Sequence, residues 1–213
     1  MHLPPGELVV VCYLLLKMMW LKFLLTWRFF RLWALADGTQ PPENMLRCMS
    51  NNISLGTFWR GWHASFNKWI VRYLYKPLGG RDTQLYSVWL IFLFVAVWHD
   101  IEWKLVAWGL LNGCFYVLEV LGRKATRSEW MQALPSNIFN VVCVLSSATY
   151  IIILIAVNLS GYAVGTGGVS LILSKLVTWD GATVLLITYY FIAVVGVSGM
   201  EFARRAGLVT SAA

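Results

Sequence analysis

Residues 85–98 read LYSVWLIFLFVAVW, and residues 99–102 continue this run as HDIE. Residues 85–98 are almost wholly apolar, and a run of this kind is typical of a helix that lies in lipid or among other apolar helices. At about 1.5 Å per residue the run is roughly 21 Å long, which is shorter than the ~30 Å hydrocarbon core of a bilayer. We therefore expect a tilted, bent or re-entrant helix that brings His99 to the lipid surface or below it.

The composition extends this interpretation to the whole chain of 213 residues. Hydrophobic residues make up 59% of the chain and charged residues only 13%, whereas a typical soluble domain is about 25% charged. The 12 Trp and 9 Tyr residues favour the membrane–water boundary. Although the net charge is +7, Lys and Arg lie mostly between apolar runs, as topology anchoring requires, so we do not expect a nucleic-acid partner.

Further apolar runs lie on both sides of this segment. Long helices are expected over residues 8–36, 105–121, 138–164 and 183–200, and a short apolar piece over residues 171–179. Residues 43–56 are polar for this chain, which indicates a loop or a short interfacial helix. The sequence thus predicts one all-α membrane domain over residues 1–213. We expect a polytopic helical bundle with four to five transmembrane helices and one or two interfacial or re-entrant pieces.

Residues 58–78 are the most distinctive segment and read FWRGWHASFNKWIVRYLYKPL. At about 100° per residue, a continuous helix would place two kinds of side chain on two faces. One face would carry Trp59, His63, Phe66, Asn67 and Ile70. Another would carry a basic stripe of Lys68, Arg72 and Lys76. We therefore expect one amphipathic helix, buried in protein or lying at the membrane interface, which ends at the proline and glycines of residues 77–80.

Two histidines are the strongest candidates for chemistry. His63 and His99 each follow a Trp in an aromatic-rich apolar segment, where an ionisable group is costly and suggests a function. Imidazole exchanges protons near neutral pH, so it suits the deprotonation of a hydroxyl or amine nucleophile. The alternative, in which each histidine is a packing residue at the interface, stays open on composition alone. The basic stripe is similarly either a cytoplasmic flank or a counter-charge for an anionic cofactor tail.

Sequence motifs for other chemistries are missing. The sequence contains no P-loop, no Gly-x-Ser-x-Gly elbow, no HExxH and no Rossmann fingerprint. The four cysteines are far apart, without the spacing of a zinc site. We therefore expect no metal cofactor.

Two separate motifs resemble those of the membrane-bound O-acyltransferase family. The first is FWRGWHASFNKW over residues 58–69 with its continuation RYLYKPLGG over residues 72–80. The second is FVAVWHD over residues 94–100, which is similar to the family's catalytic histidine segment. Upstream, WRFFRLWAL over residues 27–35 is similar to the glycerol uptake protein branch, which is related to hedgehog acyltransferase. The resemblance is best over about residues 20–120, and family members have a longer N-terminal part, so an N-terminally truncated member is expected.

The resemblance implies the transfer of a fatty acyl group from acyl-CoA, as co-substrate, to the hydroxyl of a membrane lipid or glycolipid. In this branch it implies remodelling of glycosylphosphatidylinositol anchors in the endoplasmic reticulum. His99 would be the general base, and His63 would orient the thioester or acceptor, or stabilise the oxyanion. Residues expected to bind substrate beside them are Trp59, Arg60, Asn67, Lys68, Arg72, Trp98 and Asp100. Among these, Arg60, Lys68 and Arg72 are candidates for the phosphates of coenzyme A.

Two other function classes stay open. A glycerol-transport-related membrane protein would distribute polar residues along several spans and would often contain an inverted repeat. In this sequence polarity concentrates around the two histidines instead, which favours an enzyme site. An inactive, truncated relative that binds a partner would not be stabilised thermally by acyl-CoA.

Overall fold

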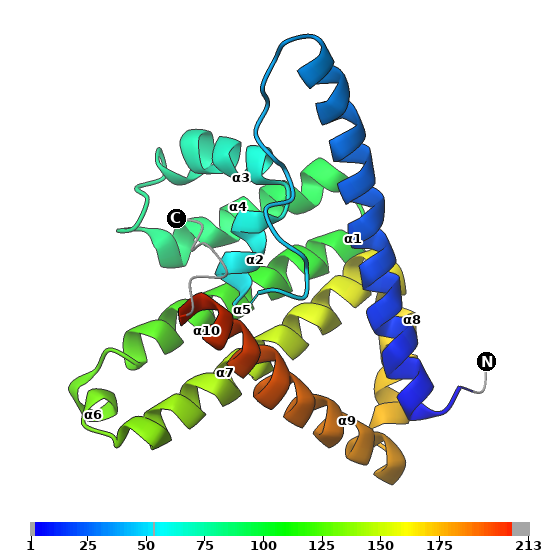
Figure 1. The fold of residues 1–213 in the computed structure, drawn as a ribbon, viewed down its shortest axis with the longest axis vertical. Helices are drawn as coiled ribbons and strands as arrows, with labels where there is room; N and C mark the ends of the chain where they lie inside the picture. The colour runs from blue at the N-terminus through cyan, green and yellow to red at the C-terminus, as the bar shows by residue number, and fades with distance from the viewer. Residues whose placement is uncertain (1–2, 53, 206–213) are drawn as a thin grey trace.

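The computed structural model describes residues 3–52 and 54–205, and over these ranges the chain is helical and contains no strand. Figure 1 shows the helices crossing one another around a central pair, α4 and α5. The predicted all-α fold is therefore confirmed. In chain order the elements are α1 (Pro5–Ala36), α2 (Leu55–Gly61), α3 (Ala64–Ile70), η1 (Val71–Tyr75), α4 (Gln84–His99), α5 (Trp103–Ala125), α6 (Glu129–Gln132), α7 (Ser136–Asn158), η2 (Leu159–Ala163), α8 (Gly165–Leu176), α9 (Trp179–Phe191), η3 (Ile192–Val197) and α10 (Ser198–Arg205).

Four helical segments of the described chain are long and apolar enough to cross a membrane. They are Pro5–Ala36, Trp103–Ala125, Ser136–Ala163 and Trp179–Val197. Helix α4 and the stretch Gly167–Leu176 are apolar but shorter. This agrees with the predicted four to five spans accompanied by shorter pieces.

Helix α1 is longer than a bilayer requires. It has 32 residues, and at about 1.5 Å per residue it extends roughly 48 Å. Its C-terminal part projects beyond the other helices (Figure 1). The helix ends where Gly38 adopts a positive φ of 77°, which is the usual conformation of a glycine that stops a helix. The loop that follows, residues 37–52, turns back towards α2.

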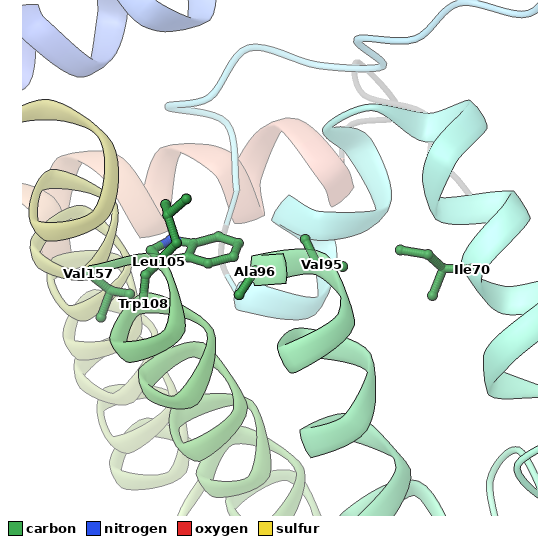
Figure 2. Close-up of a cluster of buried hydrophobic side chains, with 6 residues drawn as sticks. All are labelled: Ile70, Val95, Ala96, Leu105, Trp108 and Val157. Atoms are coloured by element: carbon green, nitrogen blue, oxygen red, sulfur yellow. The ribbon is translucent and has the colours of Figure 1, made fainter. Parts of the chain in front are cut away.

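The core forms where α4 and α5 pack against each other. Gly109 of α5 lies so close to α4 that an added Cβ would be 2.8 Å from the Phe92 carbonyl oxygen. Glycine is therefore required for this approach. The buried residues of the cluster, drawn in Figure 2, are Ile70, Val95, Ala96, Leu105, Trp108 and Val157. This packing fixes the end of α4, which is His99.

The expectation of one continuous helix over residues 58–78 is wrong. Helix α2 ends at Gly61, the backbone of Trp62 is extended, and α3 begins only at Ala64. The loop of residues 37–52 stabilises this break, because the Leu46 amide donates to the Gly61 carbonyl at 3.1 Å. The Ala64 amide likewise donates to the Asn44 carbonyl at 2.9 Å. Helical periodicity alone does not detect such a break, since the stabilising groups come from another segment.

Candidate active site

His63 has an unfavourable backbone conformation at the turn between α2 and α3. Its φ is 48° and its ψ is 57°, which makes it the one non-glycine residue with a positive φ in the described part of the chain. This region costs an L-residue about 1–2 kcal/mol, and such residues concentrate at functional sites. The imidazole Nδ1 accepts a hydrogen bond from the Phe66 amide at 3.2 Å, so His63 also caps the N-terminus of α3.

The same hydrogen bond determines the tautomer of the His63 ring. Since Nδ1 is an acceptor, the proton of the neutral ring is on Nε2. Burial lowers the pKa of His63, which keeps the ring neutral near pH 7. Trp27 of α1 contacts the ring edge-on, with 4.6 Å between ring centroids. His63 therefore presents one N–H donor, at Nε2, from a fixed orientation.

Ring contacts hold the side chain of His99, which has no hydrogen bond to the residues that the structure describes. It is the last residue of α4 and its side chain is exposed. Its ring lies edge-on to those of Trp98 at 4.8 Å and Tyr162 at 5.3 Å. Trp108, which is 1% exposed, lies further below it at 6.2 Å. An imidazole with this support and an accessible ring is suited to accept a proton from a substrate hydroxyl.

Two aromatic side chains connect the histidines. Phe66 contacts the His63 ring at 5.3 Å and stacks on Trp98 at 4.4 Å, and Trp98 contacts His99 at 4.8 Å. The two imidazoles are also close enough to interact electrostatically. The structure therefore brings both histidines to one junction, between the α2–α3 turn and the end of α4. Their catalytic role stays a prediction.

The predicted substrate-binding tryptophans lie at different depths. Trp98 is 51% exposed and lies between Phe66 and His99. Trp59 packs lower in the core, with its ring 5.5 Å from that of Trp108 and 5.9 Å from that of Phe92. Trp98 is therefore the more accessible of the two, and Trp59 packs against the core rings of Phe92 and Trp108. Their binding of substrate stays a prediction.

The three predicted cations are divided by the break in the helix. Arg60 precedes the break and interacts electrostatically with Glu119. Lys68 and Arg72 follow it, on α3 and η1, and both are exposed. The Arg72 guanidinium lies 5.7 Å from the centroid of the Tyr73 ring. Because η1 is a π-helix, with wider hydrogen-bonded turns than an α-helix, the predicted stripe with regular α-helical spacing does not continue past Ile70.

The two predicted polar residues act locally in this structure. The backbone N–H of Asn67 donates to the backbone carbonyl of His63 at 3.0 Å, within the first turn of α3. Asp100 accepts a hydrogen bond from the Ile101 amide at 2.7 Å, and its own amide donates to the Ala96 carbonyl at 3.2 Å. Asp100 therefore ends α4 directly after His99. Within the described ranges, neither side chain is hydrogen-bonded to an imidazole.

Sequence reasoning misses three residues of this region. Trp27 belongs to a helix far from the motif in sequence, and nothing in its pattern indicates a contact with His63. Tyr162 contacts His99, and its hydroxyl is buried without a hydrogen-bond partner among the described residues. Glu119 is buried inside an apolar helix, and an acidic residue in such a run is a signal that could have identified it.

An open hollow lies between α1 and Tyr162, whose ring contacts that of His99. It has a volume of about 480 Å³ and is lined by Met18, Met19, Lys22, Phe23 and Tyr162. Its walls are mostly apolar, with one cation, Lys22. Because Tyr162 also contacts His99, the hollow adjoins the junction, and its chemistry suits an alkyl chain. In the described part of the chain, no three His, Cys, Asp or Glu side chains converge as metal ligands would, and the absence of a metal cofactor stays a prediction.

Comparison with known proteins agrees with the resemblance of the two motifs. Residues 4–164 match the MBOAT, membrane-bound O-acyltransferase family. Membrane-bound O-acyltransferase gup1 of Schizosaccharomyces pombe is 42% identical over 177 residues, which are 83% of this chain and 30% of that protein. GUP1 of Saccharomyces cerevisiae is 40% identical over 176 residues, 81% of this chain and 30% of that protein. Protein-cysteine N-palmitoyltransferase HHAT of Mus musculus is 35% identical over 80 residues, 36% of this chain and 16% of that protein. The chain thus spans about 30% of the length of the two yeast relatives.

Proposed function

Because the chain belongs to the membrane-bound O-acyltransferase family, we propose that it transfers a fatty acyl group from acyl-CoA to a hydroxyl of a membrane lipid or glycolipid. The observation that carries the proposal is the junction itself. There a neutral His63 with one N–H donor and an accessible His99 are connected by Phe66 and Trp98. An apolar hollow adjoins them.

His99 is the general base of this proposal. It removes the proton of the acceptor hydroxyl as the oxygen attacks the thioester carbonyl carbon. The new C–O bond forms, the C–S bond breaks, and the departing CoA thiolate takes the proton back from the imidazolium. A thioester is already activated, so no covalent acyl-enzyme is needed. The exposed position of the His99 ring supports this assignment.

His63 is the electrophilic partner in this proposal. Its Nε2–H donates to the carbonyl oxygen, where negative charge develops during the attack. The ring is held by the Phe66 amide on one side and by Trp27 at its edge, so little reorganisation is required. Removing one hydrogen-bond donor from an oxyanion hole typically costs about 10²–10³ in kcat.

The remaining surfaces accommodate the other parts of the substrates. We assign the acyl chain to the hollow beside Tyr162, whose walls are mostly apolar. We assign the phosphates of coenzyme A to Arg60, Lys68 and Arg72, all of which are exposed. Arginine and lysine bind phosphate through charge-assisted hydrogen bonds.

We further propose glycosylphosphatidylinositol-anchor lipids as the acceptor and the endoplasmic reticulum as the compartment. The support is the resemblance of residues 27–35 to the glycerol uptake branch and the similarity of most of the chain to the yeast relatives. The identity of the acceptor is tested separately from acyl transfer itself, by the choice of acceptor lipid in the assay.

The deciding experiment measures acyl transfer by the purified protein in nanodiscs, with labelled acyl-CoA and a panel of lipid hydroxyl acceptors. We expect product with the wild-type chain and a loss of about 10²–10⁴-fold in His99→Ala. A copy extended with family-like N-terminal spans is measured in parallel. If neither form transfers with any donor and acceptor, the acyltransferase proposal fails for this chain. An inactive relative or a transport-related protein would then be the better explanation.

A further inference from the structure

The buried carboxylate of Glu119 is not used in the mechanism above. Glu119 lies in α5 and is 1% exposed. A carboxylate within an apolar helix of a membrane protein is expensive unless its oxygens are satisfied by donors or paired with a cation. Its contacts therefore indicate why this position is acidic.

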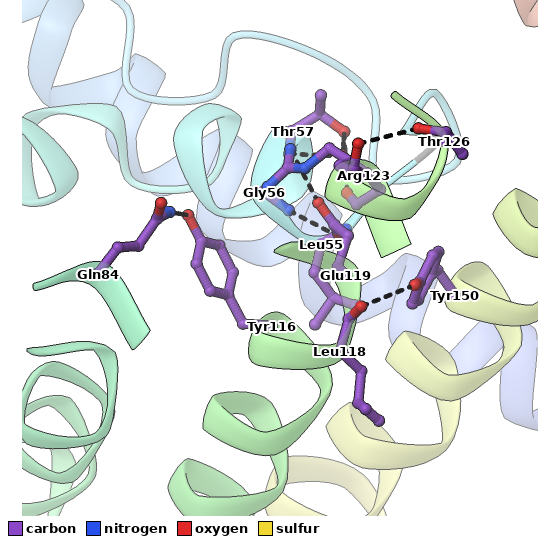
Figure 3. Close-up of polar contacts among 11 residues, drawn as sticks. Leu55, Gly56, Thr57, Gln84, Tyr116, Leu118, Glu119, Arg123, Thr126 and Tyr150 are labelled. Carbon is purple, nitrogen blue, oxygen red and sulfur yellow. Dashed lines mark hydrogen bonds and ion pairs between the residues drawn. The ribbon is translucent and has the colours of Figure 1, made fainter. Parts of the chain in front are cut away.

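Glu119 binds the beginning of α2, which is distant in sequence. Its Oε2 accepts hydrogen bonds from the amides of Leu55 at 2.6 Å and Gly56 at 3.3 Å. Its Oε1 lies 3.1 Å from Nη1 of Arg123. Figure 3 shows the carboxylate between the first turn of α2 and the Arg123 guanidinium. The Thr57 amide is satisfied separately, by Ser54 Oγ at 3.1 Å.

These contacts satisfy the first amides of a helix, which have no partners inside it. The negative charge is also favourable at the positive end of the helix dipole. Gly56 permits the close approach, because an added Cβ would be 3.3 Å from Glu119 Oε1. Glu119 therefore fixes where α2 begins and in which direction it points.

The other end of α2 leads directly to His63. The helix has seven residues, so its two ends are roughly 10 Å apart at about 1.5 Å per residue. The far end is fixed by the bond between the Leu46 amide and the Gly61 carbonyl. Because α2 is short and internally hydrogen-bonded, a displacement of its first turn also moves Gly61 and strains the Leu46–Gly61 hydrogen bond beside His63.

We propose that Glu119 is a positioning residue for the candidate active site: by holding the first turn of α2 it keeps His63 in the orientation that aims Nε2–H at the substrate carbonyl. This inference rests on the proposed acyl transfer for its functional meaning. Its structural content, the orientation of the His63 ring, is measurable without any activity.

The test uses the tautomer of His63 as a readout independent of catalysis. The chain has three histidines, so histidine-selective ¹⁵N labelling of the protein in nanodiscs gives few signals, and His63→Asn assigns the relevant one. We expect wild type to show a single neutral tautomer protonated at Nε2. In Glu119→Leu we expect a mixture of tautomers. In Glu119→Gln, which keeps one oxygen acceptor for the Leu55 amide, we expect an intermediate result.

The kinetic arm separates positioning from folding. We expect kcat to fall about 100-fold in Glu119→Leu, since misalignment of a reacting group by about 1 Å costs roughly 10²-fold. In Glu119→Gln we expect a smaller fall, of about 10-fold. In both variants KM for acyl-CoA should change less than about twofold. Glu129→Gln is the matched control, because Glu129 is an exposed acid on α6. If Glu119→Leu does not fold, Glu119→Gln carries the test.

Two results would overturn the positioning role. One is a lower unfolding temperature in Glu119→Gln together with an unchanged His63 tautomer. The other is a loss that appears in KM and leaves kcat unaltered. If wild type itself shows no acyl transfer, the proposed function fails, but the tautomer measurement still decides the role of Glu119.

Discussion

His63 has two roles at the α2–α3 turn: its backbone adopts the left-handed conformation that the turn requires, and its side chain caps α3. Asparagine or glycine would adopt the backbone conformation of His63 with less strain. The backbone conformation alone therefore does not explain why residue 63 is a histidine. What histidine adds is an imidazole whose Nδ1 is engaged by the Phe66 amide and whose Nε2 is left as a donor. The backbone strain and the ring orientation are therefore two parts of one arrangement.

Substitutions of His63 should separate these two parts. His63→Asn should keep stability within about 0.5 kcal/mol, because asparagine tolerates a positive φ and caps helices well. His63→Val should lose about 2 kcal/mol, since a β-branched residue resists this region and offers no cap. Chemical unfolding in detergent, followed by circular dichroism, checks both. Equal stability of the two variants would show that the turn does not depend on residue 63.

The burial of His63 also predicts a pH dependence of stability. Its pKa is lowered in the folded chain, so the unfolded state binds more protons, and stability falls as the pH drops below about 6.5. The unfolding midpoint of wild type should therefore decrease between pH 7.5 and pH 5.5. In His63→Asn this decrease should be smaller, although His99 still titrates. An identical decrease in both proteins would contradict the assignment to His63.

At the scale of the element, α4 and α5 act as one unit that presents His99. Their close approach depends on Gly109, which lies against the backbone of Phe92. The short connection after Asp100 leaves the end of α4 little freedom to move independently of α5. The position of His99 is thus set by helix packing, whereas that of His63 is set by hydrogen bonds at a turn.

Gly109→Ala should separate these two helices. Its Cβ would meet the Phe92 carbonyl oxygen at 2.8 Å, and such overpacking typically costs about 1–3 kcal/mol. We expect a lower unfolding midpoint and, if the proposed acyl transfer holds, a lower kcat through displacement of His99. Gly167→Ala is the control, because it lies in a helix with open space around an added Cβ, and its midpoint should not decrease. A tolerated Gly109→Ala would mean that α4 and α5 can shift without penalty.

Sequence patterns predicted the helices better than the turns between them. The expected helices over residues 8–36 and 105–121 correspond to Pro5–Ala36 and Trp103–Ala125, because long apolar runs leave few alternatives in a membrane. The break at His63 was not predicted, since it depends on backbone groups of residues 44 and 46. Both histidines were identified as candidates from their chemistry. Their connection through Phe66 and Trp98, and the roles of Trp27 and Tyr162, depend on packing between distant segments.

On the scale of the whole molecule, the loop of residues 37–52 joins α1 to the His63 turn. On the α1 side, Arg28 forms an ion pair with Glu43 at 3.4 Å, and Lys17 Nζ lies 2.8 Å from Cys48 Sγ. On the other side, Asn44 accepts hydrogen bonds from the Ser65 amide and hydroxyl at 2.9 and 2.8 Å. Because Trp27 also contacts His63, the docking of α1 and the shape of the candidate site are coupled.

The thiol of Cys48 should report whether α1 is docked. Burial alone would raise the pKa of Cys48, but hydrogen bonds from Lys17 and Ser50 and the charge of Lys17 bring it below its ordinary value. We therefore expect Cys48 to be alkylated by iodoacetamide at pH 7 faster than Cys12, which is buried among apolar side chains and is less accessible to the reagent. Lys17→Met should slow alkylation of Cys48 several-fold, and Lys22→Met, which leaves the Cys48 contacts intact, should not. Mass spectrometry of the labelled peptides measures both rates. If Lys17→Met leaves the Cys48 rate unchanged while the protein stays folded, α1 is not held to the loop through this contact. The coupling of α1 to His63 would then rest on the other contacts, among them the ring contact of Trp27 and the Arg28–Glu43 ion pair.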